Sequence, residues 1–477
     1  MSAFRVNSNH GAAGRTIIIY VTVSVAVTVA VRAVFAGMPW LWVAVMAAVT
    51  DLSLTVYAHT SGYSRGGAAV LAVVSGLLGT GVIVNVWYYT VHAGGTDAAP
   101  VLLNSDSMRF WRDAADFMRE PDEFFGHISS YSYVLAALFR LTGPSVSACC
   151  ILSMAAVMGA LVQLSAVACS LGLSRAQCAL SVAVMGCVCY WLSMGCVLLK
   201  DAWVICAMIF AVRGMLAGKP TWQLALATVM LCVARLHFLG LAVVGLVLTS
   251  ILPGFRNVRA TVIARLVWMA AILLVWYGAA ILLNSVSASE YQGVQSSIQD
   301  ELTDTSHFAY YRIFGDIGAL PLWRKLLMTP VAACVQFFVP FPWNWSRDLV
   351  FGPTFVYAHF AYPGYLFGAV AIYFFGDTVS RLYRRHLSAL QGRIAVVAMY
   401  GLFCWLVPCV MYGGTVSRYG LPALAMMAPA VAYTLTRRSR SRAFVVWMAV
   451  FAVVTAVVLV TAYHLQTAAM TGPNPLS

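Results

Sequence analysis

Charged residues are scarce in this 477-residue chain, in which Asp, Glu, Lys and Arg together make up 9%. A soluble globular protein carries roughly 25% charged residues, so that class is excluded. Acidic residues are the scarcer sign, with 16 against 29 basic ones. The chain has instead 61% hydrophobic residues and a mean hydropathy of +0.84. This balance predicts an all-α, polytopic membrane protein.

Three other features are missing. The 12 cysteines show no zinc-type spacing with histidine, and most lie in apolar runs, where cysteine is usually a small buried side chain. No internal repeat of the kind typical of secondary transporters is evident. The first apolar run follows Arg5 and Arg15 and is too long for a cleavable signal peptide. The sequence therefore indicates neither a disulfide framework nor a metal site, and no cofactor.

Apolar runs recur along the chain and predict about thirteen transmembrane helices. Two long polar segments, residues 92–143 and 285–349, interrupt them. Each contains a short apolar run, Tyr131–Leu141 and Leu326–Val339, which we expect to form an amphipathic or re-entrant helix. The expected spans are 16–36, 38–57, 68–91, 144–170, 177–195, 201–217, 220–235, 238–252, 263–284, 350–375, 393–413, 419–436 and 443–464.

The basic residues predict an orientation. With a cytoplasmic N-terminus, the short inner loops hold 17 of the 29 basic residues, as positively charged inner loops usually do. The two long segments then face outward and carry seven and six acids, which is 13 of the 16 carboxylates. We expect an integral protein of the bacterial inner membrane, with its active site on the periplasmic or extracellular face. The net charge of +13 is explained by basic residues that cluster in short loops between apolar runs, so no nucleic-acid partner is expected.

Polar residues at the membrane rim gather on the outer side in this topology. Ionisable groups there are costly, so they are candidates for a functional site. Each also has a structural explanation: an N-cap for a helix over 107–118, a salt link within a Lys-Asp pair, or an arginine that reaches the interface. The residues are Asp106, Lys200, Asp201, Arg235, His237 and Arg418.

The types of these residues suggest a substrate. Arg and Lys bind phosphate or diphosphate, and a carboxylate suits a general base for a sugar hydroxyl. Two outer aromatic segments could stack on sugar rings or form an interfacial aromatic belt. They contain Tyr310, Tyr311 and Arg312 in FAYYRIFG, and Trp343 and Trp345 in PFPWNWSRD.

Several short motifs together resemble the C-type (GT-C) superfamily of polytopic glycosyltransferases. They are Asp106-x3-Phe110-x3-Ala114 with the amphipathic YSYVLAALFRLTGPS, the Lys200-Asp201 pair at the start of a span, Arg235, the Pro340–Trp345 element and Arg418 to Pro422. The resemblance is to the polyprenyl-phosphate-sugar-dependent enzymes related to protein mannosyltransferases and aminoarabinose transferase. It covers residues 90 to 436.

The resemblance implies residue roles. Asp106 would be the catalytic base that activates the acceptor, and Asp201 the second acid. Lys200, Arg235 and Arg418 would hold the donor phosphate. The chain departs from the family in placing its Asp after the third span, so the hairpin of residues 1–67 would be an addition before a catalytic core of 68–436. Residues 437–477 would add a basic inner loop and a last helix. Asp106 belongs to no paired-carboxylate motif, so a divalent cation is possible but not indicated.

The favoured function is an inverting membrane glycosyltransferase that moves a sugar from a polyprenyl-phosphate-type carrier to a glycan, lipid or protein acceptor. Two alternatives remain open. One is an O-antigen or exopolysaccharide polymerase or ligase that uses a lipid-diphosphate-linked glycan. In such an enzyme Arg235 and Arg418 would be the main functional residues and Asp106 would be secondary. The other is a transporter or flippase for a polar lipid, which would need ionisable groups near the bilayer midplane.

Overall fold

The protein is mainly helical in the part of the chain that the computed structural model describes, and no strand occurs there, which confirms the all-α class. The described residues are 40–60, 63–92, 105–125, 128–217, 221–235, 238–240, 242–243, 363–412 and 420–471. The helices are α2 Trp40–Thr60, α3 Arg65–His92, α4 Ser105–Arg119, α5 Pro121–Phe124, α6 Ser130–Thr142, α7 Val146–Ser170, α8 Arg175–Gly186, α9 Cys189–Ser193, α10 Asp201–Ala217, α11 Trp222–Ala234, α17 Pro363–Tyr383, α18 Ala389–Tyr412, α19 Leu421–Arg438 and α20 Arg442–Thr471.

Five helical segments of the described residues are long and apolar enough to cross a bilayer, which supports an integral membrane protein. They are Trp42–Thr60, Arg65–Trp87, Val146–Leu171, Ala389–Leu406 and Arg442–Thr461. The predicted number of thirteen spans is not established. The predicted spans 16–36 and 263–284 and the re-entrant run Leu326–Val339 lie outside the described residues.

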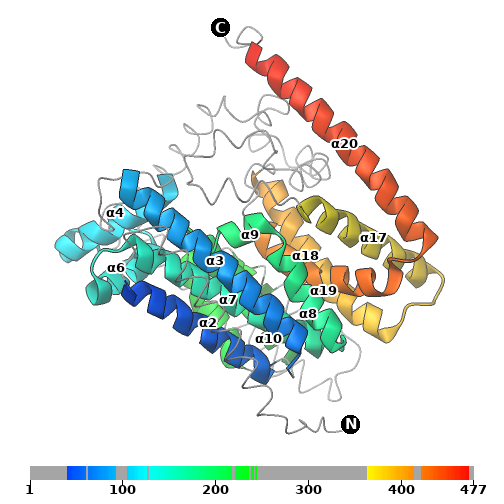
Figure 1. Ribbon diagram of the computed structural model, residues 1–477, viewed down its shortest axis with the longest axis horizontal. Helices are drawn as coiled ribbons and strands as arrows, with labels where there is room; N and C mark the ends of the chain where they lie inside the picture. Colours follow the sequence, from blue (N-terminus) through cyan, green and yellow to red (C-terminus); the bar gives the residue numbers. More distant parts are fainter. Residues whose placement is uncertain are drawn as a thin grey trace.

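Helix α7 forms the centre of the bundle, and 83% of the residues in its most apolar 18-residue stretch are buried. Helices α2, α3, α8 and α10 pack around it. Helix α19 connects this group to α17 and α18, because it contacts α8 and α10 as well as α17 and α18. Helix α20 is peripheral. Only 6% of its apolar window is buried, and in Figure 1 it runs along the outside of the bundle beside α17.

Side-chain caps explain where several helices begin. Ser145 and Thr221 accept hydrogen bonds from backbone amides of the first turns of α7 and α11. Ser174 and Gln177 form a reciprocal capping box that starts α8. Gly172 lies between α7 and α8 with a φ of 93°, in the left-handed region that glycine adopts without strain.

The predicted span 177–195 is not one continuous helix. The chain forms α8 and the short α9, and then runs without helix through residues 194–200 before α10 begins at Asp201. Lipid cannot satisfy the polar groups of a non-helical backbone, so such a segment needs protein around it. The side chains of Met194 through Leu199 are accordingly buried.

The described helices give the bundle two chemically different ends. One end, here called the Asp201 end, comprises residues 194–200, Lys200, Asp201, Arg235 and the first turn of α4. Asp201 opens α10 and Arg213 lies twelve residues further along it, so the opposite end is about 18 Å away. That opposite end, here called the arginine-rich end, comprises Arg175, Arg213, Arg381, Arg384, Arg385, Arg393, Arg437, Arg438, Arg440 and Arg442.

Close packing of α18 on α19 depends on Gly401. A Cβ placed there would lie 2.9 Å from the carbonyl oxygen of Ala423 and 3.0 Å from Cβ of Met426. We expect Gly401→Ala to destabilise the protein by about 1–3 kcal/mol, because the backbone of α19 would have to move. Gly376→Ala in α17 is the matched control. No atom lies within 4 Å of its added Cβ, so helix propensity should make it neutral or stabilising in a thermal unfolding assay.

Candidate functional site at the Asp201 end

Three of the eleven residues predicted for the site have described side chains, namely Lys200, Asp201 and Arg235. The backbone of Asp106 is described as part of α4, whereas its side chain lies outside the described residues. Helix α4 begins at Ser105, so Asp106 stands in the first turn and not at the cap of a helix over 107–118. The remaining predicted residues, which lie outside the described residues, are His237, Tyr310, Tyr311, Arg312, Trp343, Trp345 and Arg418.

A buried ion pair is the central feature of this end. Arg235 Nη2 donates a hydrogen bond of 3.0 Å to Asp201 Oδ1, and the two side chains are only 6% and 5% exposed. Arg235 is the C-cap of α11 and Asp201 opens α10, and these two helices pack against each other. Each charge therefore lies at the helix end whose dipole favours it.

Helix length would place this pair at membrane depth if α11 starts at one surface of a bilayer. Helix α11 has 13 residues, which corresponds to about 20 Å, whereas the hydrocarbon core of a bilayer is about 30 Å thick. If α11 starts at one surface of the bilayer, Arg235 ends it before the other surface is reached. An ionised pair in such surroundings is stable only when its members hold each other.

One carboxylate oxygen of this pair is left over. Asp201 Oδ2 is buried and accepts no hydrogen bond from any described residue, and the indole Nε1 of Trp203, in the first turn of α10, has no partner there either. Buried polar atoms without partners are costly, so they indicate a place for a polar ligand group or a water molecule. An acceptor and a donor are thus both open close to the start of α10.

Helix α4 closes over this region with an aromatic face. Its buried residues Ser107, Phe110, Trp111 and Ala114 recur at helical spacing, and the helix packs on α6. Phe110 meets Tyr131 of α6 edge to face at 5.3 Å between ring centroids. Burial raises the pKa of the Tyr131 phenol well above its usual range, so this hydroxyl stays protonated.

Lys200 sits against α4. Its Nζ lies 4.9 Å from the centroid of the Phe110 ring, within the range of a cation–π contact. The side chain is half-buried. A lysine held in this way keeps a compact positive charge at the edge of the site, next in sequence to Asp201.

Residues 194–200 connect these parts through two hydrogen bonds. Asn85 Nδ2, about two turns before the end of α3, donates to the carbonyl of Cys196 at 2.8 Å. Ser107 Oγ, from the first turn of α4, donates to the carbonyl of Leu198 at 2.6 Å. Ser107 follows Asp106 directly, and Leu198 precedes Asp201 by three residues. The two predicted carboxylates therefore lie on segments that are bonded to each other.

Sequence reasoning missed both of these donors. Asn85 carried a usable signal, since a single amide within the apolar run GVIVNVWYY must find a partner in the bundle. Ser107 carried none, because a serine near a helix start usually caps it.

No group of three or more His, Cys, Asp or Glu side chains that could hold a metal ion occurs among the described residues. The chain matches no protein-family model, no curated protein and no solved structure. The chemistry of the Asp201 end is therefore inferred from the contacts among α3, α4, α10, α11 and residues 194–200.

Proposed function

We propose that this protein is an inverting membrane glycosyltransferase, which moves a sugar from a polyprenyl-phosphate-type carrier to an acceptor on the outer face of the membrane. The observation that carries the proposal is the hydrogen bond from Ser107 to Leu198. It ties the first turn of α4, with Asp106, to the segment that ends in Lys200 and Asp201. Lys200 and a buried ion pair thereby lie at the same end of the bundle as the backbone of Asp106.

In this proposal, Asp106 removes the proton from the acceptor hydroxyl as its oxygen bonds to the anomeric carbon of the donor sugar. The bond between that carbon and the phosphate oxygen breaks on the opposite face, so the configuration inverts. The electron pair leaves with the polyprenyl phosphate, and Lys200 stabilises the growing negative charge. The acceptor proton ends on the Asp106 carboxylate.

Asp201 and Arg235 receive a positioning role. Because Arg235 already donates to Asp201, it is less able than Lys200 to bind a phosphate of its own. The pair fixes the start of α10 against the end of α11, and with it the backbone on which Lys200 stands. Asp201 Oδ2, which no described residue binds, remains available to a sugar hydroxyl.

The test is a transfer assay with the purified protein in liposomes. Polyprenyl-phosphate sugars labelled in the sugar are supplied, and both the labelled product and free polyprenyl phosphate are measured. We expect label to reach an acceptor in step with release of the lipid phosphate. Movement of intact labelled lipid across the bilayer without turnover would identify a flippase. Turnover of lipid-diphosphate glycans alone would identify a polymerase or ligase.

The acceptor can be found independently in cells. Mass spectrometry of the cell envelope after deletion of the protein should show which glycan, lipid or protein loses one sugar residue. An unchanged envelope together with an inactive protein in liposomes would contradict the proposed transfer.

A further inference from the structure

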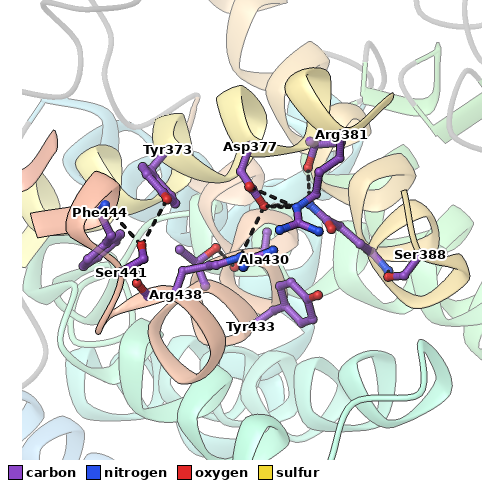
Figure 2. Close-up of polar contacts among 12 residues, drawn as sticks. Tyr373, Asp377, Arg381, Ser388, Ala430, Tyr433, Arg438, Ser441 and Phe444 are labelled. Atoms are coloured by element: carbon purple, nitrogen blue, oxygen red, sulfur yellow. Dashed lines mark hydrogen bonds and ion pairs between the residues drawn. The ribbon is translucent and has the colours of Figure 1, made fainter. Parts of the chain in front are cut away.

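A second polar cluster lies at the arginine-rich end, remote from Asp201. Its centre is Asp377 of α17, whose two carboxylate oxygens accept hydrogen bonds from Arg381 Nε at 3.0 and 2.9 Å. Arg438 of α19 places its Nε 3.5 Å from the same Oδ2, and Gln391 Nε2 of α18 donates to it at 3.1 Å. Figure 2 shows Arg381 and Arg438 reaching Asp377 from α17 and α19. We call Asp377, Arg381, Gln391 and Arg438 the Asp377 cluster.

The cluster holds two guanidinium groups with a single carboxylate, so it retains one positive charge. Asp377 is the only acidic residue in the ranges 363–412 and 420–471. Five further arginines lie in the last turn of α19, in the turns after α17 and α19, or at the start of α20, and all of them are exposed: Arg384, Arg385, Arg437, Arg440 and Arg442. An anion is the ligand that this excess of charge favours.

The contacts with Asp377 leave the Nη amines of Arg381 and Arg438 available to bind an anion. Arg381 Nε donates hydrogen bonds to the Asp377 carboxylate, whereas Arg438 Nε approaches it only as an ion pair at 3.5 Å, without a hydrogen bond. Neither arginine uses its Nη amines in a hydrogen bond to a described residue. Both side chains keep part of their surface exposed, at 30% and 26%. Guanidinium groups that are already fixed lose little freedom on binding, and their forked amines match the oxygens of a phosphate.

The position of the cluster indicates that this phosphate belongs to a lipid. Helix α20 begins at Arg442, beside the cluster, and its apolar window has a mean hydropathy of 2.8 with only 6% buried. Tyr373 and Ser441 join the start of α20 to α17 through their hydroxyls, 3.4 Å apart. Val379 and Leu382 on α17 are also more than 60% exposed. Apolar helices exposed in this way meet acyl chains, so the arginines at their ends lie at headgroup level.

We propose that Arg381 and Arg438, held by Asp377, bind the phosphate headgroup of an anionic phospholipid, with the exposed arginines of both turns as an outer ring of positive charge. This site is separate from the Asp201 end and does not depend on the transfer reaction.

The test measures retention of phosphatidylglycerol by the full-length protein. The protein is placed in nanodiscs of equimolar phosphatidylcholine and phosphatidylglycerol and released into detergent, and the bound lipids are identified by native mass spectrometry. We expect the wild type to retain phosphatidylglycerol selectively. The double variant Arg381→Lys with Arg438→Lys keeps the charge but loses the forked donors, and should bind this lipid about tenfold more weakly.

Two further variants test whether the lipid binds specifically at the Asp377 cluster or is attracted only by the overall positive charge. Arg119→Gln with Arg140→Gln removes two positive charges from the exposed ends of α4 and α6, and should leave retention unchanged. Arg437→Gln with Arg440→Gln leaves the Asp377 cluster intact, and should weaken binding less than the lysine variant does. Equal retention by the lysine variant and the wild type would overturn the proposal. Competition by inorganic phosphate at the concentration of the lipid would show that the site takes a free anion instead.

Discussion

Replacing Arg235 by methionine is expected to destabilise the protein by about 3–5 kcal/mol, because the buried carboxylate of Asp201 would lose its only charged partner among the described residues. The surroundings of Asp201 offer no other charged side chain, among the described residues, that pairs with it and could take the place of Arg235. Asp201 is 4% exposed, and its second oxygen already lacks a hydrogen bond from any described residue. Methionine is shorter than arginine but fills a similar volume with a flexible apolar side chain, so most of the loss reports the charge and not a cavity.

The double variant Arg235→Met with Asp201→Leu tests this explanation. Removing both charges together avoids the unpaired carboxylate, so most of the stability should return. Arg140→Met, an exposed arginine of α6, is the matched control and should change stability by about 0.5 kcal/mol or less. Unfolding can be followed in detergent with a thiol-reactive dye, since buried cysteines such as Cys149 and Cys206 react only in the unfolded protein. A single variant as stable as the control would show that the pair contributes nothing.

The same double variant separates positioning from chemistry. If Asp201 and Arg235 only fix α10 against α11, a variant that regains stability should also regain transfer activity. If Asp201 takes part in the reaction as a second acid, stability would return while activity stays low. Lys200 is left unchanged in both cases, so its electrostatic contribution is the same.

Sequence reasoning located the members of this pair but could not join them. Asp201 and Arg235 are 34 positions apart, and both were candidates for the site. The structural alternatives from the sequence paired Asp201 with Lys200 and let Arg235 reach the membrane interface. Whether two helix ends meet depends on how α10 and α11 pack, and apolar composition does not determine packing. The type and place of α4, α6 and α10 were predictable, because each follows from periodicity or from a clear polar boundary.

The predicted spans 177–195 and 201–217 place a break at residues 196–200, close to the observed non-helical segment 194–200, but the contacts that hold this segment were not predictable. The residues of MGCVLLK are mostly apolar, so the sequence does not show which groups bind their backbone. The structure departs from helix because Asn85 and Ser107, which are distant in sequence, donate to the carbonyls of Cys196 and Leu198. Long-range hydrogen bonds thus decide the local conformation, as they often do in helices that are broken within a membrane.

The arginines of the later helices show a different limit of the sequence. A count of positive charges correctly marks one end of the bundle as basic, but it treats every arginine alike. The structure separates Arg381 and Arg438, which Asp377 orients, from Arg384 and Arg385, which are exposed. Only the oriented pair has the geometry for a specific ligand.

Asp106→Asn is expected to lower kcat of the proposed transfer by a factor of about 10² to 10⁴, which is the usual contribution of a general base. Asparagine has nearly the same shape but cannot accept the proton of the acceptor hydroxyl. KM for the polyprenyl-phosphate sugar should change little, because Lys200 and the backbone that carries it would still bind the donor. Steady-state rates measured over a range of donor concentrations separate the two parameters.

Asp116→Asn is the matched control, since it makes the same change ten residues further along α4. Among the described residues the Asp116 carboxylate pairs only with Arg119, in a partly exposed contact at 3.8 Å, so the variant should transfer sugar at the wild-type rate. The outcome also discriminates between enzyme classes. If Asp106→Asn remained close to wild type while Lys200→Met lost most of its activity, no base would be needed at this position. The remaining requirement for a cation at a lipid phosphate would then favour the polymerase or ligase, in which basic residues lead.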